Sequence, residues 1–353
     1  MQHFNQLHPS FKLNDKSYSL QSLYSLGVAL AEKENFEKAI GLFLIEWLSK
    51  DTTIVVHTSG STGTPKPIVL KKEHMVNSAI ATGSFFELKE GDTALLCLPA
   101  AYIAGKMMLV RAMVLGLALD FVDPSSNPLE KAKSNYDFCA MIPLQVNASI
   151  HKLNQVKKLI IGGAAVSVDL KNKLKNGTTL LYETYGMTET ITHIAVKQIN
   201  AITTSFKALP NVTLSVDSRD CLIVYAPKIS TQLITTNDVV TLVSDTEFKW
   251  LGRYDTIINS GGIKLNPEQI ETKLSDFITT DFFISSLPDV ILENKLILLI
   301  EGPEGLTDLI SMLKNSSVFS TYEIPKEIYY LPAFVHTASG KINRSKTVDL
   351  LKL

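Results

Sequence analysis

The sequence predicts an α/β protein in which a large layered N-terminal domain, residues 1–252, precedes a small α+β C-terminal domain, residues 253–353. The length of 353 residues is typical of about two domains. Short β-rich runs alternate with longer amphipathic stretches up to residue 186, which is the pattern of strands joined by crossover helices. Beyond that point the pattern changes twice, first to closely spaced hairpins and then to a small mixed region.

The first fifty residues favour helices, because apolar side chains recur at three- and four-residue spacing over residues 20–33 and 36–50. From residue 52 onward, short runs rich in β-branched and apolar residues predict strands, and the stretches between them predict helices. The predicted strands are 52–58, 93–99, 117–123, 137–143 and 157–163, and the predicted helices among them are 74–88 and 105–117.

Hairpin-like strands at 212–217, 221–226 and 238–245 are separated by turn residues and predict a small mixed β region that closes the first domain. A Gly-containing stretch at 251–255 marks the predicted boundary. The next helix should begin with Asn266 as its cap and Pro267 at its first position. This helix is predicted to extend over 268–277, and the remaining predicted elements are a helix at 306–314 and strands at 281–287, 295–301 and 326–331.

Composition narrows the choice of partners. The 34 Lys and Arg residues against 35 Asp and Glu give a net charge of -1, so no whole-chain field favours nucleic acid or acidic membranes. The longest apolar stretch, 107–119, is too short to span a bilayer, and the N-terminus has no secretory signal pattern. Three scattered cysteines are typical of reduced thiols, so we expect a cytoplasmic protein. The oligomeric state stays open, a homo-oligomer included.

A segment rich in Gly and hydroxyl residues follows the run Ile-Val-Val-His at 54–57 of the first predicted strand. Its backbone and side chains offer many hydrogen-bond donors, which suits a polyphosphate. It is not a Walker loop, because Lys66 stands between two prolines instead of between Gly and a hydroxyl residue. The residues of this predicted phosphate loop are Thr58, Ser59, Gly60, Ser61, Thr62, Gly63, Thr64 and Lys66. On its own the segment is equally consistent with a surface turn.

This loop resembles the phosphate loop of the adenylate-forming acyl-CoA ligases, the group that includes firefly luciferase and peptide-synthetase adenylation domains. Further matches follow in the order typical of that family. They are Gly162-Gly163-Ala164-Ala165, Tyr185-Gly186-Met187-Thr188-Glu189, Asn237-Asp238, Gly252-Arg253-Tyr254-Asp255, Ser260-Gly261-Gly262 and Ser339-Gly340-Lys341-Ile342-Asn343-Arg344. The matches span most of the chain. They imply a large adenylate-forming domain with a small mobile C-terminal domain, and ATP, Mg²⁺ and CoA as cofactor and co-substrates.

The resemblance assigns roles along the segment from Tyr185 to Glu189. Tyr185 is expected to stack on adenine, with Gly186 allowing close backbone approach. Thr188 is expected to contact the α-phosphate and Glu189 to hold Mg²⁺, because a carboxylate is a ligand that Mg²⁺ prefers. Without the resemblance, the same residues would be read as a turn at a strand end, with Glu189 a solvated charge.

The remaining nucleotide contacts are also implied by the resemblance. Gly163 and Ala164 belong to the nucleotide site, and Asp238 accepts the ribose hydroxyls. Arg253 contacts the ribose or the phosphates, although an interdomain salt bridge is an alternative role. Taken alone, Asn237-Asp238 is an ordinary turn.

Four residues belong to the two half-reactions and to the domain motion between them in the family. Lys341 is expected to bridge the acyl carboxylate and the α-phosphate, where charge builds in the transition state. Asp255 matches the hinge. Gly261 and Gly262 fit the wall of the channel for the CoA arm, where a Cβ would obstruct the thiol.

The acid itself is expected to bind near Tyr102, Ala104, Gly105 and Lys106, with Lys106 as counter-charge to a second carboxylate. A lysine that extends its ammonium to the surface is the alternative. Short forms such as this chain resemble the o-succinylbenzoate CoA ligases of menaquinone synthesis, which implies conversion of o-succinylbenzoate to its CoA thioester. A ligase for another aromatic or fatty acid, an enzyme that loads a separate carrier protein, and an inactive nucleotide-binding regulator remain as alternatives.

Overall fold

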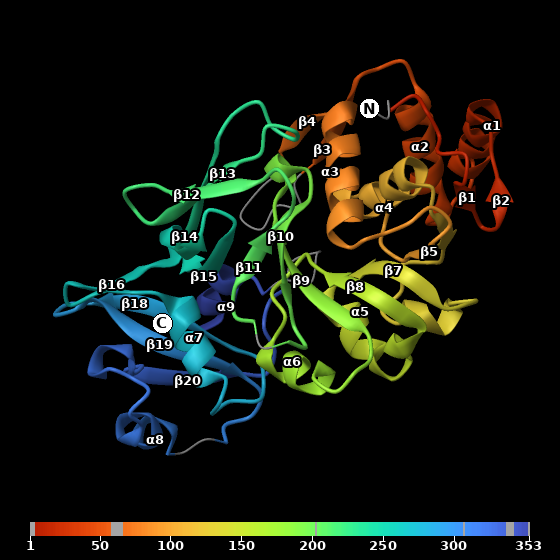
Figure 1. The fold of residues 1–353 in the computed structure, drawn as a ribbon. Coiled ribbons are helices and arrows are strands. Elements are labelled where there is room, and N and C mark those ends of the chain that lie inside the picture. The colour runs from red at the N-terminus through yellow and green to blue at the C-terminus, as the bar shows by residue number, and fades with distance from the viewer. Residues whose placement is uncertain (1–3, 58–65, 202, 306–307, 337–341, 352–353) are drawn as a thin grey trace. The chain divides into compact units, whose positions relative to one another are not determined.

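A computed structural model describes residues 4–57, 66–201, 203–305, 308–336 and 342–351 (Figure 1). The chain divides into two compact units. The first contains Met1–Leu214, Val224–Ile234 and Ser244–Glu247, and the second contains Ser215–Ile223, Thr235–Val243 and Phe248–Leu353. The sequence predicts a boundary between residues 252 and 253, at the hinge between the two domains. That boundary stays a prediction.

The first unit is built on a mostly parallel sheet, which confirms the α/β class. Its strands lie in the order β11-β10-β9-β8-β7-β5-β6-β1-β2. The pairs from β9 across to β1 are parallel, whereas β9, β10 and β11 pair antiparallel. The strands are β1 (Lys12–Leu13), β2 (Lys16–Ser17), β5 (Thr93–Leu96), β6 (Ala118–Phe121), β7 (Tyr136–Met141), β8 (Val156–Ile161), β9 (Leu180–Gly186), β10 (His193–Gln198) and β11 (Phe206–Ala208).

Helices connect these parallel strands, as the alternating pattern predicts. They are α1 (Leu20–Ala31), α2 (Glu37–Leu48), α3 (Lys72–Phe85), α4 (Ile103–Leu115), α5 (Pro143–Ala148) and α6 (Val168–Leu174). Helix α4 is buried along almost its whole length, from Gly105 to Val114. Because a helix buried on every face exposes no polar side to water, any charged residue on α4 must find its partner inside the protein.

The strand before the phosphate loop departs from the predicted crossover pattern. Strand β3 (Thr53–His57) pairs antiparallel with β4 (Pro67–Lys71) in a separate two-stranded sheet. His57 lies opposite Pro67, so the predicted phosphate loop connects two strands of a hairpin. The sequence pattern predicted strand β3 correctly. It did not predict the pairing of β3 with β4, which follows the loop.

Strands β12 (Thr213–Val216), β13 (Cys221–Tyr225), β14 (Ile234–Ser244) and β15 (Glu247–Arg253) follow one another as neighbours, as the hairpin pattern predicts. The second unit continues with a smaller sheet of order β17-β16-β19-β18, with β20 pairing parallel to β19. Its elements are β16 (Ile258–Ser260), β17 (Ile263–Leu265), α7 (Pro267–Leu274), β18 (Phe282–Asp289), β19 (Glu293–Glu301), α8 (Leu309–Asn315), β20 (Glu327–Leu331) and α9 (Arg344–Val348). Asn266 caps α7 by accepting from the backbone of Glu268 and Gln269, as predicted.

In the part of the chain that the structure describes, no helix combines the length and the apolar character needed to cross a membrane.

A buried lysine joins two helices of the first unit. Lys72 begins α3 and is fully buried, and its Nζ donates to the carbonyl oxygens of Glu46 at 2.8 Å, Trp47 at 2.9 Å and Ser49 at 3.2 Å. The last carbonyls of a helix have no intrahelical partner and carry partial negative charge. Lys72 therefore satisfies the C-terminal end of α2, even though burial lowers its pKa from the ordinary value.

We predict that Lys72→Met lowers the free energy of unfolding by about 2 to 3 kcal/mol, because it removes the ammonium donor from carbonyl oxygens at the end of α2, including that of the buried Trp47. Lys71→Met is the matched control. Lys71 is exposed, so its loss should change stability by less than about 0.5 kcal/mol. Urea denaturation of the two variants measures both values, and equal stability of the two variants would contradict the capping role of Lys72.

Candidate active site

Several predicted site residues lie outside the described residues. These are Thr58, Ser59, Gly60, Ser61, Thr62, Gly63, Thr64 and Lys341. Lys66 is described and is exposed immediately before β4. The site is therefore built below from the other predicted residues, each within its own unit.

The carboxyl ends of β8 and β9 present two of the predicted motifs on the same edge of the parallel sheet. The Gly162-Gly163-Ala164 turn follows β8, and Gly163 has a φ of +82°, a backbone region that favours glycine. A Cβ on Gly162 would lie 2.6 Å from the hydroxyl oxygen of Thr184 on β9. The turn and β9 are thus in close contact, and ligands of open α/β sheets bind at this edge.

The buried carboxylate of Glu183 holds this edge together. Its Oε1 accepts from the backbone N–H of Val166 at 3.2 Å, and its Oε2 lies 3.1 Å from Lys171 and 3.0 Å from Lys197. Burial alone would raise the pKa of Glu183, but the charges of Lys171 and Lys197 bring it below its ordinary value. The ionised carboxylate therefore ties the segment after β8 to α6, β9 and β10.

The turn between β9 and β10 carries Thr188 and Glu189. The Thr190 hydroxyl accepts from the N–H of Met187 at 2.9 Å and donates to the carbonyl of Thr192 at 2.7 Å. Ile191 has a φ of +67°, which is strained for a β-branched residue. A Cβ on Gly186 would lie 2.3 Å from the carbonyl oxygen of Thr192, so the backbone segments at Gly186 and Thr192 approach closely.

This turn leaves Thr188 half-buried and Glu189 exposed. Among the described residues, no cluster of His, Cys, Asp and Glu forms a ready-made metal site. A single exposed carboxylate suits Mg²⁺, which keeps several waters and is usually held by one or two carboxylates together with substrate phosphates. The donor set at Glu189 therefore fits a magnesium ion that arrives with ATP.

Tyr185 lies half-buried at the end of β9, where its ring centroid is 6.0 Å from that of Phe206 on β11. The ammonium of Lys197 lies over the other aromatic ring, 4.3 Å from the Phe206 centroid. Phe206 thus packs between Tyr185 and Lys197. The Tyr185 ring at this strand end can offer a face to a base.

Arg111 on α4 is the most unusual charged group in the first unit. It is 1% exposed, and its guanidinium makes only long contacts, 3.6 Å to the sulfur of Met108 and 3.5 Å to both the Thr192 hydroxyl and Nδ1 of His193. Its Nε has no partner, and no carboxylate lies within ion-pair distance of it among the described residues. Burial lowers the pKa of Arg111 to about 9.

His193 faces the same guanidinium from β10. Its Nε2 lies 3.5 Å from the Thr82 hydroxyl on α3. Burial, and then the charge of Arg111, lower the pKa of His193 well below its ordinary value, so the imidazole is neutral. The cluster of Arg111, Thr82, Thr192 and His193, called the arginine cluster below, carries one net positive charge in an enclosed site.

The predicted acid-binding residues lie at the N-terminal end of α4. Tyr102 is 54% exposed and caps the helix, and Ala104 is exposed. A Cβ on Gly105 would lie 2.4 Å from the carbonyl oxygen of Pro99, so only glycine fits there. Lys106 is buried, and its Nζ lies 3.4 Å from Oε2 of Glu46 and 4.9 Å from the Phe43 ring centroid. Lys106 thus has an internal carboxylate partner, which weakens the case for it as counter-charge to a substrate.

In the second unit, Asp238 on β14 is 7% exposed. Its Oδ1 accepts from the indole N–H of Trp250 on β15 at 3.2 Å and lies 3.9 Å from the guanidinium of Arg253. Arg253 also donates twice to Asp255, with both distances 2.9 Å. The predicted ribose ligand, its arginine and the predicted hinge residue are therefore joined in one network.

The predicted channel glycines connect β16 and β17. Gly261 and Gly262 have φ of +57° and +79°, so both positions favour glycine. A Cβ on Gly262 would meet no described atom within 4 Å. Farther along the chain, three residues after Lys341, Arg344 makes a two-fold contact of 2.8 Å with the carboxylate of Glu271 on α7.

The sequence profile of the AMP-binding enzyme family matches residues 27–224, more than half of the chain. The chain belongs to this family. The match covers the phosphate loop, the turn after β8 and the Tyr185–Glu189 segment.

Relatives within the family extend over nearly the whole chain. It is 23% identical to a 2-succinylbenzoate–CoA ligase of Listeria monocytogenes over 91% of this chain and 74% of that protein. It is 22% identical to the ligase of the same name from Escherichia coli K12, over 94% of this chain and 74% of that protein.

Solved structures agree with the fold. An acyl-CoA synthetase (AMP-forming)/AMP-acid ligase II-like protein from Dyadobacter fermentans is 34% identical, with a TM-score of 0.62 over 93% of this chain and 98% of that one. The o-succinylbenzoate CoA synthetase of Bacillus subtilis in complex with ATP and magnesium is 18% identical, with a TM-score of 0.72 over 87% of this chain and 74% of that one.

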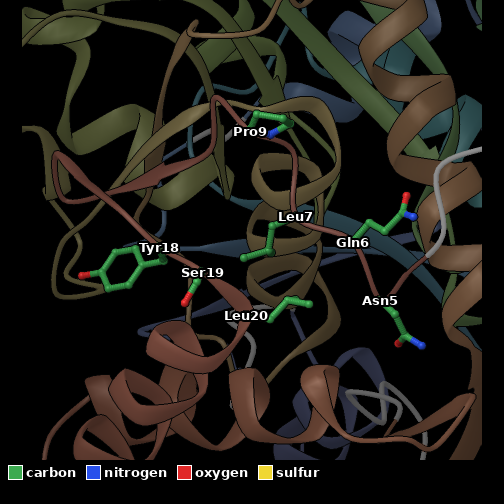
Figure 2. A pocket seen from close by; sticks show the side chains of 7 residues that line it. All are labelled: Asn5, Gln6, Leu7, Pro9, Tyr18, Ser19 and Leu20. Carbon is green, nitrogen blue, oxygen red and sulfur yellow. The ribbon is translucent and has the colours of Figure 1, made fainter.

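A surface pocket elsewhere in the first unit does not belong to this site. Figure 2 shows its lining, which consists of Asn5, Gln6, Leu7, Pro9, Tyr18, Ser19 and Leu20. None of these is a predicted site residue, and the lining shown offers no acidic or basic side chain.

The motif analysis did not assign roles to Arg111, His193, Glu183 or Trp250. One signal for Arg111 was present in the sequence, since it interrupts an otherwise apolar helical run at 107–119. An arginine in a helix that has no polar face must be buried, and a buried arginine needs a partner. Glu183 and Trp250 gave no such signal, because their partners lie on other elements.

Proposed function

We propose that this chain is an ATP-dependent acid–CoA ligase that converts 2-succinylbenzoate to 2-succinylbenzoyl-CoA, with AMP and pyrophosphate as the other products. Membership of the AMP-binding family, the relatives named 2-succinylbenzoate–CoA ligase and the motif residues support the proposal. The free thiols of Cys97, Cys139 and Cys221 favour a cytoplasmic location.

The reaction has two steps. A carboxylate oxygen of the acid attacks the α-phosphorus of ATP, and pyrophosphate leaves with the electrons of the broken P–O bond. The CoA thiolate then attacks the acyl carbon, and AMP leaves. Negative charge on the phosphates must be offset in the first step, for which we propose the phosphate loop, Thr188 and Lys341. Mg²⁺ held by Glu189 would neutralise phosphate charge further.

The observation that carries the choice of acid is the arginine cluster. A buried cation without a counter-ion costs several kcal/mol, so the protein gains by receiving an anion there. Arg111 lies on the helix whose N-terminal end carries Tyr102, and it contacts the chain just after the Thr188–Glu189 turn. A second carboxylate on the acid would supply the missing charge. A fatty acid or a simple aromatic monocarboxylate has no group to place against Arg111.

The other basic residue of α4 fits this role less well. Lys106 already has Glu46 as an ion-pair partner. The two residues are five positions apart and so project from different faces of the helix, about 140° apart. We therefore propose Arg111, in place of Lys106, as the main contact for the second carboxylate.

Lys341→Ala is predicted to suppress adenylate formation while affecting thioester formation from supplied acyl-adenylate much less. The reason is that Lys341 is proposed to act only where charge develops on the phosphate. Pyrophosphate release measures the first half-reaction, and thioester mass from a supplied acyl-adenylate measures the second. Equal losses in both half-reactions would show that Lys341 has a structural or shared role.

Arg111→Met is predicted to lower kcat/KM for 2-succinylbenzoate by roughly ten- to a hundredfold, which corresponds to about 1.5 to 3 kcal/mol for a lost charge-assisted contact. A monocarboxylic analogue, 4-oxo-4-phenylbutanoate, should be affected little. Folding should not suffer, because the substitution removes an unpaired buried charge.

Lys106→Met on the same helix is the matched control, and it should lower the use of both acids to a similar extent. The proposed role of Arg111 is wrong if Arg111→Met also lowers kcat/KM equally for both acids. If the wild-type protein does not prefer 2-succinylbenzoate to the monocarboxylate, the choice of acid is wrong and only the broader ligase activity remains.

A further inference from the structure

We infer that Trp250 is a positioning residue for nucleotide binding, whose indole N–H holds the Asp238 carboxylate in the orientation that accepts the ribose hydroxyls of ATP. The inference rests on the proposed function only in that the chain binds ATP through Asp238. It does not depend on which acid is activated.

The indole of Trp250 lies closer to Oδ1 of Asp238 than the guanidinium of Arg253 does. Trp250 Nε1 lies 3.2 Å from Oδ1 of Asp238, across the neighbouring strands β14 and β15. Asp238 is 7% exposed, so water has little access to orient its carboxylate. A hydrogen bond to a charged acceptor in such a place is stronger and more directional than one on an exposed surface.

Arg253 is a weaker constraint on the same oxygen. Its guanidinium lies 3.9 Å from Oδ1 of Asp238, beyond hydrogen-bond distance. It donates instead to both oxygens of Asp255 at 2.9 Å. Arg253 is thus engaged with Asp255, and of the two side chains the indole of Trp250 makes the closer contact with the Asp238 carboxylate.

The backbone at Asp238 is fixed separately. The N–H of Asp238 donates to the Thr236 hydroxyl at 3.0 Å, and that hydroxyl donates to the carbonyl of Leu222 at 2.9 Å. The guanidinium of Arg219 donates to Oδ1 of the neighbouring Asn237 at 3.3 Å. Because these contacts do not involve the indole, loss of the Trp250 N–H should change the carboxylate and leave the strand in place.

An aromatic ring at this position could also serve only for packing. Trp250 is half-buried, and a phenylalanine would keep most of the apolar contact. A packing role predicts that Trp250→Phe binds nucleotide normally. The positioning role predicts a defect that depends on the ribose hydroxyls.

The test measures dissociation constants of ATP and 2′,3′-dideoxyATP, with Mg²⁺ and without acid, for the wild-type protein and Trp250→Phe. The wild type should bind ATP more tightly than the dideoxy compound. In Trp250→Phe, ATP should bind about tenfold to a hundredfold more weakly, the size expected for a hydrogen bond to a charged group. Binding of 2′,3′-dideoxyATP should not change, so the preference for ribose shrinks.

Trp250→His is the second variant, since its ring can again present an N–H donor at this position, and it should restore part of the preference for ribose. An undiminished preference in folded Trp250→Phe overturns the inference. An equal loss of affinity for both nucleotides also overturns it, because it would indicate a structural role. If the wild type itself shows no preference, the ATP site of the proposed function fails instead, so the two failures are distinguishable.

Discussion

The carboxylate of Glu183 is the interaction on which the organisation of the nucleotide-binding edge depends. It bonds the backbone at Val166 and pairs with Lys171 and Lys197, so one buried charge joins the chain after β8, helix α6 and strands β9 and β10. The two motifs of this edge, the glycine turn and the Tyr185–Glu189 segment, are held in register by it. The strained turn after Glu189 can persist because its flanking strands are fixed in this way.

Arg111 is a second buried charge and, unlike Glu183, it lacks a partner of opposite charge among the described residues. Glu183 forms ion pairs with two lysines, whereas the more deeply buried Arg111 has no carboxylate partner in the part of the chain that the structure describes. His193 cannot compensate it, because an imidazole is either neutral or cationic, and burial and the guanidinium lower its pKa and keep it neutral. Proteins rarely keep an uncompensated buried charge without a use for it. In the proposed function, a dianionic acid gives Arg111 that use and connects substrate choice to the turn that carries Thr188 and Glu189.

Local patterns predicted the α/β class, the hairpin region and the Asn266 cap, because each depends on residues close together in the sequence. The ordered motifs predicted the family. Pairing partners were harder: β3 pairs with β4 outside the main sheet, and the partner of Lys106 is Glu46, sixty residues earlier on another helix. The Trp250–Asp238 contact likewise joins two strands whose register no local pattern gives. Tertiary packing decides these contacts. The sequence therefore pointed to Lys106 as the counter-charge, whereas we propose Arg111 for that role because Lys106 is paired with Glu46.

The most direct test of the account is a panel of carboxylic acids incubated with the wild-type protein, ATP, Mg²⁺ and CoA, with pyrophosphate release and thioester mass as readouts. The account predicts that 2-succinylbenzoate gives the highest kcat/KM, with one pyrophosphate released for each CoA thioester formed. A higher kcat/KM for fatty or simple aromatic monocarboxylic acids would contradict the role given to the buried arginine. Absence of pyrophosphate release with every acid would contradict the ligase activity itself.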